Sequence, residues 1–232
     1  MLARTIRCCA LGTVLLALLA AFVGSFPAER QNVVHAAEPD APALAAGDVD
    51  PATSRVYVRV GKRRLGHEHG VEGRIKSGRL TLDAADNAGE IVFDMTSFKA
   101  DTDAGRKYVG LEGVSDADEQ TEVTATMTGK GVLEVEKHPT ATFTVKSSKV
   151  MKEKSEDGRA QYELTGEFDL HGKKQPLTVV AVAGETADGQ QQIKGTFTIK
   201  QTDYGITPYR ALGGLVAVTD ELKIFGDLWV QQ

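Results

Sequence analysis

The residues whose types and spacing most directly suggest chemistry are His67 and His69, which alternate in the segment 66–70. If this segment is extended, both imidazoles point to the same face with Cβ atoms about 7 Å apart, near enough to share a metal ion. A third ligand would have to come from His138, His171 or a carboxylate, and neither of those histidines has a metal-like spacing. The segment therefore allows a metal-dependent enzyme or a redox protein, while ordinary hydrogen-bonded histidines are the simpler interpretation.

Other sequence signatures of catalysis are absent. The chain has no Gly-x-Ser-x-Gly nucleophile elbow and no glycine-rich phosphate loop ahead of a helix. Its two cysteines, Cys8 and Cys9, both fall in the N-terminal segment, so the rest of the chain has neither a thiol nucleophile nor a disulfide. Most strand carboxylates alternate with apolar residues and are expected to face solvent. We therefore predict no catalytic residue, no metal, no cofactor and no enzymatic activity.

The elements that would position any site are strands. Beyond residue 50, apolar residues recur at every second position, which is the period of a β-strand with one buried face. These segments cover residues 56–60, 80–82, 91–95, 141–145, 162–170, 177–183, 193–199 and 222–230, with a weaker strand over 66–75. About eight such strands predict an all-β fold, namely a closed antiparallel barrel whose apolar interior can hold one small ligand.

One clear helix is predicted, over residues 115–128. Ser115 and Asp118 have the spacing of a capping box, and glycines at positions 129 and 131 end the segment. Val123 and Met127 share one face of this helix. Together with a looser turn over 106–111, it would form a short helical insertion at one mouth of the barrel, either as a space-filling plug or as a movable lid.

Residues 1–37 have the features of an export signal, because Arg4 and Arg7 precede a short apolar run over 8–23. The small residues at 34–36 lie far past that run, so an uncleaved anchor that associates with the membrane is the alternative. Residues 38–49, rich in Ala, Pro and Asp, are expected to form a disordered linker. Residues 50–232 then form one domain. We expect a periplasmic or secreted protein.

The net charge of the chain argues against some classes of binding partner. The formal net charge is −5, from 27 basic against 32 acidic residues. A net acidic chain without a basic stripe argues against nucleic-acid binding and against electrostatic docking on anionic lipid. The sequence does not indicate an oligomeric state.

Several short motifs follow one another along residues 48–231. They are Asp50-Pro51-Ala52-Thr53-Ser54, Val71-Glu72-Gly73, Phe93-Asp94-Met95-Thr96-Ser97, His138-Pro139-Thr140-Ala141-Thr142-Phe143, the hairpin segment 164–177, Asp203-Tyr204-Gly205-Ile206 and Val218-Thr219-Asp220-Glu221-Leu222. Each is short, but their order resembles that of the YceI-like family of lipid-binding barrels.

The resemblance implies an eight-stranded, lipocalin-like barrel that holds a polyisoprenoid chain in an apolar pore. It implies an exported protein that carries or sequesters an isoprenoid such as a polyprenyl pyrophosphate or a quinone. The side chains expected to contact this lipophilic ligand are Phe93, Phe143, Leu164, Phe168, Phe197 and Ile224. A structural envelope module with a filled barrel is a further alternative.

Two departures from the family pattern fall near the expected mouth. The family arginine is commonly followed by aspartate, whereas Arg106 is followed by Lys107, and residues 112–131 resemble an insertion. If Arg106 and Lys107 face a ligand head group, their charge would favour a pyrophosphate or a polar quinone ring. A solvated surface pair is equally compatible with the sequence.

Overall fold

A computed structural model describes residues 43–113 and 115–232, all within one compact unit, Pro42–Gln232. This unit contains every described strand and helix together with the hydrophobic core, so it is the folding unit. The predicted export signal and most of the predicted linker lie outside the described residues. Residues 47–49 differ from the linker prediction, because Val49 is buried and bridges Val230.

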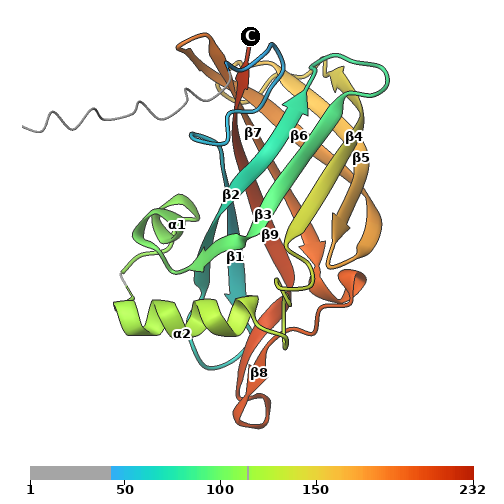
Figure 1. Cartoon of the computed structure of the whole chain (residues 1–232). Coiled ribbons are helices and arrows are strands. Elements are labelled where there is room, and N and C mark those ends of the chain that lie inside the picture. Colours follow the sequence, from blue (N-terminus) through green and yellow to red (C-terminus); the bar gives the residue numbers. More distant parts are fainter. Residues whose placement is uncertain (1–42, 114) are drawn as a thin grey trace, which may run out of the picture. The chain divides into compact units, whose positions relative to one another are not determined.

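Eight long strands make the fold (Figure 1). They are β1 (Arg55–Lys62), β2 (His69–Leu80), β3 (Gly89–Ala100), β4 (Thr140–Val150), β5 (Gln161–Leu170), β6 (Lys173–Ala187), β7 (Gln190–Lys200) and β9 (Val216–Gln231). A two-residue strand, β8 (Arg210–Ala211), forms a hairpin with the start of β9. The segments predicted separately at 66–75 and 80–82 belong largely to one strand, β2, which ends at Leu80.

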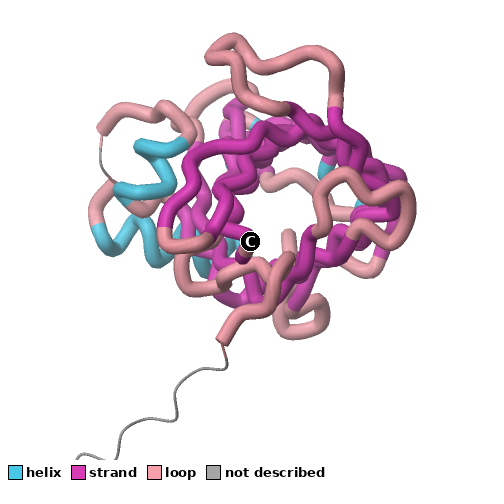
Figure 2. Tube along the Cα trace, turned by 90° about the horizontal axis from the view of Figure 1, so that it is seen from above, coloured by secondary structure: helices cyan, strands magenta, loops and turns pink. Residues whose placement is uncertain are grey.

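The sheet closes on itself. Each strand is antiparallel to its neighbour, and β1 pairs with both β2 and β9, so that Val58 lies opposite Val71 on one side and Ile224 on the other. Viewed from above, the strands form a ring around an open centre of the trace (Figure 2). Closure removes the unpaired backbone groups that an open sheet exposes at its edges. The predicted all-β, eight-stranded antiparallel barrel is therefore confirmed.

Apolar and polar residues alternate along the strands, and this alternation determines which side chains point into the barrel. In β5, for example, Leu164, Phe168 and Leu170 are buried, while Glu163 and Thr165 are exposed. The same period of two runs through β3 and β4. The interior is consequently aliphatic and aromatic, and the polar partners face solvent.

Two helices follow β3; in Figure 1, α1 lies at the left side of the barrel and α2 lies below it, toward the lower end. α1 (Asp103–Tyr108) begins at Thr102, whose hydroxyl accepts a hydrogen bond from the Gly105 amide. α2 (Ala117–Thr128) begins at Asp116, whose carboxylate accepts from the Glu119 amide, so the cap lies one residue after the predicted Ser115. No helix in the described part of the chain is long and apolar enough to cross a membrane.

Glycine allows α1 to contact the barrel. A Cβ on Gly70 of β2 would lie 2.7 Å from the Cα of Arg106, so only a residue without a side chain fits there. On the other side of α1, Tyr108 stacks on Tyr57 of β1 with ring centroids 3.9 Å apart, and its hydroxyl donates to Asp227. The helix is thereby fixed to β1, β2 and β9.

Glycine in the barrel wall gives a test of this packing. A Cβ on Gly166 would lie 2.0 Å from the Thr144 carbonyl oxygen, whereas one on Gly226 meets nothing closer than 4.0 Å. We expect Gly166→Ala to lower the free energy of unfolding by about 3 kcal/mol, the upper range for overpacking, since backbone must move. Gly226→Ala, the matched control, should change it by less than about 1 kcal/mol. Equal urea midpoints for the two variants would contradict the register described here.

Candidate functional site

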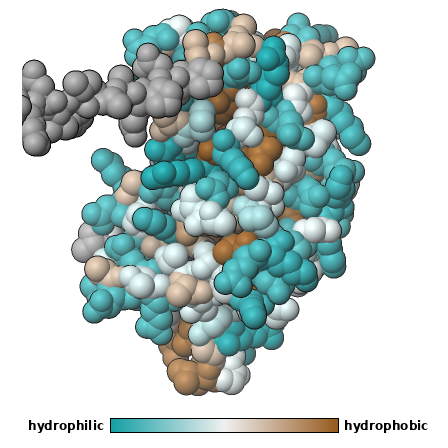
Figure 3. All heavy atoms as spheres, in the orientation of Figure 1, coloured by the Kyte–Doolittle hydropathy of each residue, from teal (hydrophilic) through white to brown (hydrophobic). Residues whose placement is uncertain are grey.

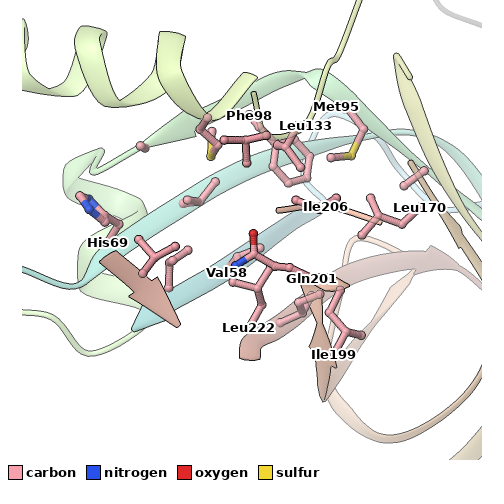
Figure 4. Close-up of a pocket in the computed structure, with 18 of the residues that line it drawn as sticks. Val58, His69, Met95, Phe98, Leu133, Leu170, Ile199, Gln201, Ile206 and Leu222 are labelled. Carbon is pink, nitrogen blue, oxygen red and sulfur yellow. The ribbon is translucent and has the colours of Figure 1, made fainter. Parts of the chain in front are cut away.

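The barrel interior is not completely filled. A cavity of about 220 Å³ lies among side chains of seven strands, α2 and the segments that follow α2 and β7 (Figure 4). Its wall is formed mainly by Val56, Val58, Val60, Val71, Phe93, Met95, Phe98, Ala100, Val123, Met127, Val132, Leu133, Ala141, Phe168, Leu170, Phe197, Ile199, Ile206, Val218, Leu222 and Ile224. An apolar enclosure of this kind suits a hydrophobic group.

Four of the residues expected to contact the ligand lie together, on the inward faces that the alternation of apolar and polar residues predicted. Phe93, Phe168, Phe197 and Ile224 all line the cavity. Phe168 lies edge-on to three aromatic rings, with centroid distances of 5.8 Å to Phe93, 6.0 Å to Phe197 and 5.7 Å to Tyr204. Edge-to-face contacts hold rings in fixed orientations, so this cluster forms a rigid aromatic wall.

Phe143 and Leu164 do not line the cavity. Both are buried, but they belong to the part of the interior that side chains fill. The ring of Phe143 lies 3.0 Å from the position that a Cβ on Gly166 would occupy, so this glycine lets the phenyl group pack onto β5. Sequence alternation identifies the inward face of a strand, but it does not show where along the strand the void begins.

Arg106 is also placed differently from the sequence expectation. Its side chain is not among those lining the cavity, and its guanidinium donates to Asp101 Oδ1 at 3.0 Å and to the carbonyls of Glu68, Glu112 and Gly113. The group is therefore used to hold the loop after α1 and is not presented to a ligand. Lys107, its neighbour, is exposed on α1.

The polar side chains of the cavity wall are His69, Glu122, Thr126, Gln201 and Tyr209. The sequence had singled out His69 for its alternation with His67. Glu122 and Thr126 could have been suggested by α2, because they flank the predicted apolar pair Val123 and Met127. Gln201 follows β7 and is fixed by a hydrogen bond from its amide to the Thr219 carbonyl. No sequence pattern distinguished Gln201 or Tyr209.

His69 is oriented by a buried carboxylate. Its Nδ1 lies 2.6 Å from Oδ2 of Asp101, and Oδ1 of the same group accepts hydrogen bonds from the Gly70 amide and from Arg106. Asp101 is fully buried. Burial alone would raise the pKa of Asp101, but the bonds from His69, Gly70 and Arg106 outweigh it and hold this pKa below its ordinary value. Facing an ionised carboxylate, Nδ1 carries the proton, which leaves Nε2 as the group available to a ligand.

The rings of His67 and His69 lie close together, with centroids 4.5 Å apart, although His67 precedes β2 and is not on a strand, and Asp101 supplies a nearby carboxylate. The contacts nevertheless fit a hydrogen-bond network better than a metal site. The 2.6 Å between His69 Nδ1 and Asp101 Oδ2 is shorter than the ~3.4 Å that separates two ligand atoms on one tetrahedral zinc ion. Arg106 also neutralises the same carboxylate. His138 and His171 are elsewhere, next to Glu134.

Comparison with known proteins agrees with this geometry. A model of the YceI-like domain matches residues 48–228. The fold is similar to that of Burkholderia cenocepacia BcnA, at 19% identity and TM-score 0.52 over 79% of this chain and 99% of that one. It is also similar to a polyisoprenoid-binding domain from Saccharophagus degradans, at 13% identity and TM-score 0.54 over 81% and 99%. No curated protein sequence matches the chain.

The Asp101 network predicts a pH-dependent contribution to stability. Since the folded-state pKa is lowered, the contribution is present above the unfolded value of about 3.9 and is lost as pH falls through the folded value. We expect Asp101→Asn to destabilise by about 3 kcal/mol at pH 7, because Arg106 loses its buried partner. The difference from wild type should shrink below pH 4 in urea unfolding. Asp86→Asn, at an exposed position, should behave like wild type at every pH. A constant difference across pH would contradict this assignment.

Proposed function

The chain belongs to the YceI-like domain family, and from that premise we propose that it is a binding protein that encloses the tail of an isoprenoid-type lipid in its barrel. The observation that supports this most directly is the apolar cavity of about 220 Å³. Each methylene transferred from water into such a space contributes about 0.8 kcal/mol. The Saccharophagus degradans neighbour is named as a polyisoprenoid-binding domain, which supports the same ligand class for this cavity.

Cavity size limits how much of a lipid is enclosed. One water-sized group needs about 10–15 Å³ measured in this way, so the cavity holds on the order of 15–20 such groups. That is a few five-carbon isoprene units. A longer tail would therefore extend past the wall or require side chains such as Met95 and Met127 to move, which their unbranched, flexible chains permit.

The polar wall indicates which head group suits the site. Lys and Arg do not occur among the residues that line the cavity, and the only charged carboxylic acid there is Glu122. A pyrophosphate would meet no cationic side chain there, whereas a quinone ring or an alcohol could use the imidazole of His69 and the amide of Gln201. We therefore favour a head group without net charge.

The carrier role and export are parts of the same proposal. The described cavity wall contains no cysteine or serine that could act as a nucleophile beside His69. We propose carriage or sequestration, with no chemical step. The N-terminal charge and apolar pattern supports export to the periplasm or secretion, with a retained anchor as the alternative.

A single charge in the wall should abolish binding. Phe197→Asp would place a carboxylate in the cavity without a partner, so retention of an isoprenoid quinone should fall by at least tenfold. Val180→Asp, on the exposed outer face of the neighbouring strand β6, is the matched control and should bind like wild type. Ala141→Trp fills the space without adding charge and should also weaken binding.

The measurement is native mass spectrometry of the folding unit 42–232 after incubation with the quinone, with circular dichroism to verify folding. A bound mass of several hundred daltons on wild type and on Val180→Asp alone is the expected outcome. Wild-type protein that remains ligand-free, or folded Phe197→Asp and Ala141→Trp that bind normally, would overturn the proposal in favour of a structural barrel.

A further inference from the structure

A second cluster of metal-ligating groups lies apart from the His69 network. Glu134 and His138 come from the loop between α2 and β4, and His171 comes from the turn between β5 and β6. Their ligand atoms all lie within 4.8 Å of one another. The rings of His138 and His171 have centroids 4.3 Å apart, and Glu134 Oε2 is 4.0 Å from His171 Nε2. Residues separated by more than thirty positions in the sequence thus converge on one point.

The backbone holds these three side chains in place. The Glu134 carbonyl accepts a hydrogen bond of 2.9 Å from the His138 amide, so a single hydrogen-bonded turn joins the two residues. His171 and Gly172 form the two-residue turn between Leu170 and Lys173, with φ values of 54° and 73°. Turns with two such residues favour Asn-Gly or Asp-Gly, so a histidine at the first position is unusual.

His171 carries the clearest sign of a missing partner. Its Nε2 is buried and forms no hydrogen bond, and among the described residues it is the single buried side-chain nitrogen or oxygen in this condition. The 4.0 Å to Glu134 is too long for a hydrogen bond. It is about 0.6 Å longer than the ~3.4 Å that separates two ligand atoms on one tetrahedral zinc ion, so the Glu134 carboxylate would turn slightly toward His171 to bind the same ion.

We propose that Glu134, His138 and His171 bind a divalent transition-metal ion, with Zn²⁺ as the expected species. Two imidazoles and one carboxylate are a zinc ligand set that leaves one position open for water. Lys137, whose ammonium lies 3.7 Å from the Glu134 carboxylate, is 68% exposed and is free to turn outward.

The site would connect two parts of the cavity wall. Leu133 and Leu170 line the cavity, and each directly precedes a proposed ligand, Glu134 or His171. An ion shared by these ligands would fix the loop after α2 to the β5–β6 turn. The metal therefore has a structural role in this assignment, and it takes no part in a reaction.

Zinc titration of the metal-stripped folding unit 42–232 tests the assignment by calorimetry. We expect one Zn²⁺ per chain, and at least tenfold weaker binding in His171→Asn, which keeps a residue suited to the turn. His138→Gln should weaken binding similarly. His67→Asn is the matched control and should bind like wild type. Absence of stoichiometric binding in wild type, unchanged binding in both cluster variants, or loss of binding in His67→Asn would overturn the proposal. Zinc should also raise the melting temperature of wild type and of His67→Asn, and should raise that of His171→Asn and His138→Gln by less.

An independent observation concerns the surface around the cavity mouth. Three leucines are exposed there: Leu212 at 75%, Leu65 at 62% and Leu215 at 49%. The Leu65 amide donates to the Leu215 carbonyl at 3.1 Å, so the 62–66 loop and the β8–β9 hairpin form one tip. Figure 3 shows hydrophobic atoms gathered at this lower end, where Figure 1 places β8. We call these two segments the apolar tip.

Positive charge surrounds the apolar tip. Lys62, Arg63, Arg64 and Arg210 are all exposed, and none of them forms a salt bridge with another described residue. Lys62, Arg63 and Arg64 form a short basic run in the sequence that the net acidic charge obscured, and the fold places Arg210 of the β8–β9 hairpin at the same end. Tyr209 and Val218, which flank the hairpin, line the cavity, so the tip adjoins its entrance.

The geometry points to a bilayer surface containing anionic lipid as the partner of the apolar tip. Leucines entering the interface, ringed by arginine and lysine, match the arrangement of interfacial membrane anchors. The cavity entrance would then face the membrane, which is the source of a water-insoluble ligand. Only this last step rests on the proposed function; docking itself does not.

Vesicle co-sedimentation of the folding unit 42–232 tests docking without any ligand. We expect binding to vesicles of phosphatidylcholine with 30% phosphatidylglycerol, and at least fivefold weaker binding in 0.5 M salt. Binding should be at least tenfold weaker for the double variant Leu212→Ser/Leu215→Ser. It should be equally reduced for the triple variant Lys62→Ser/Arg63→Ser/Arg64→Ser. Lys149→Ser/Lys152→Ser/Lys154→Ser makes the same charge change near the β4–β5 connection and is the matched control. No binding by wild type, equal binding to neutral vesicles, or loss in the control would overturn the proposal. Quinone binding measured separately shows whether the cavity proposal stands.

Discussion

Closure of one antiparallel sheet is the constraint on which the rest of the structure depends. Because β1 pairs with β9 as well as with β2, each of the eight long strands has a neighbour on both sides, and one face of each must point into the same enclosed space. That space excludes water, so the inward positions are apolar. Eight strands enclose more volume than side chains fill, and the difference is the cavity.

The two ends of the barrel differ in how far side chains fill the interior. Toward one end, side chains such as Phe143 and Leu164 pack the interior completely, and Gly166 makes room for them. Toward the other, α2 and the segments after β7 surround an opening, and most polar wall residues gather there. A gradient from an apolar floor to a polar entrance would orient an amphipathic lipid with its tail inward.

The buried Asp101 carboxylate organises the entrance. It joins His69 and Gly70 of β2 to Arg106 of α1, so one charged group fixes the start of a strand, a helix and the loop that follows. Arg106, which the sequence suggested for ligand contact, instead forms its hydrogen bonds within this network. What remains available to a ligand is the imidazole that the network orients.

The sequence by itself determined the barrel, because a period of two in apolar residues is a local property that a closed sheet directly satisfies. It also determined α2 to within two residues at its start, through capping, and the inward positions of Phe93, Phe168, Phe197 and Ile224. Only the tertiary structure decided where the interior is void, since that depends on how rings such as Phe143 fill the space across strands. It also decided the partners of Arg106 and the convergence of Glu134, His138 and His171, because contacts between residues far apart in the chain produce no recognisable spacing in the sequence. At the apolar tip, the sequence contains the basic run 62–64, but only the fold places this run beside the exposed leucines of the β8–β9 hairpin, because a surface depends on which residues lie side by side.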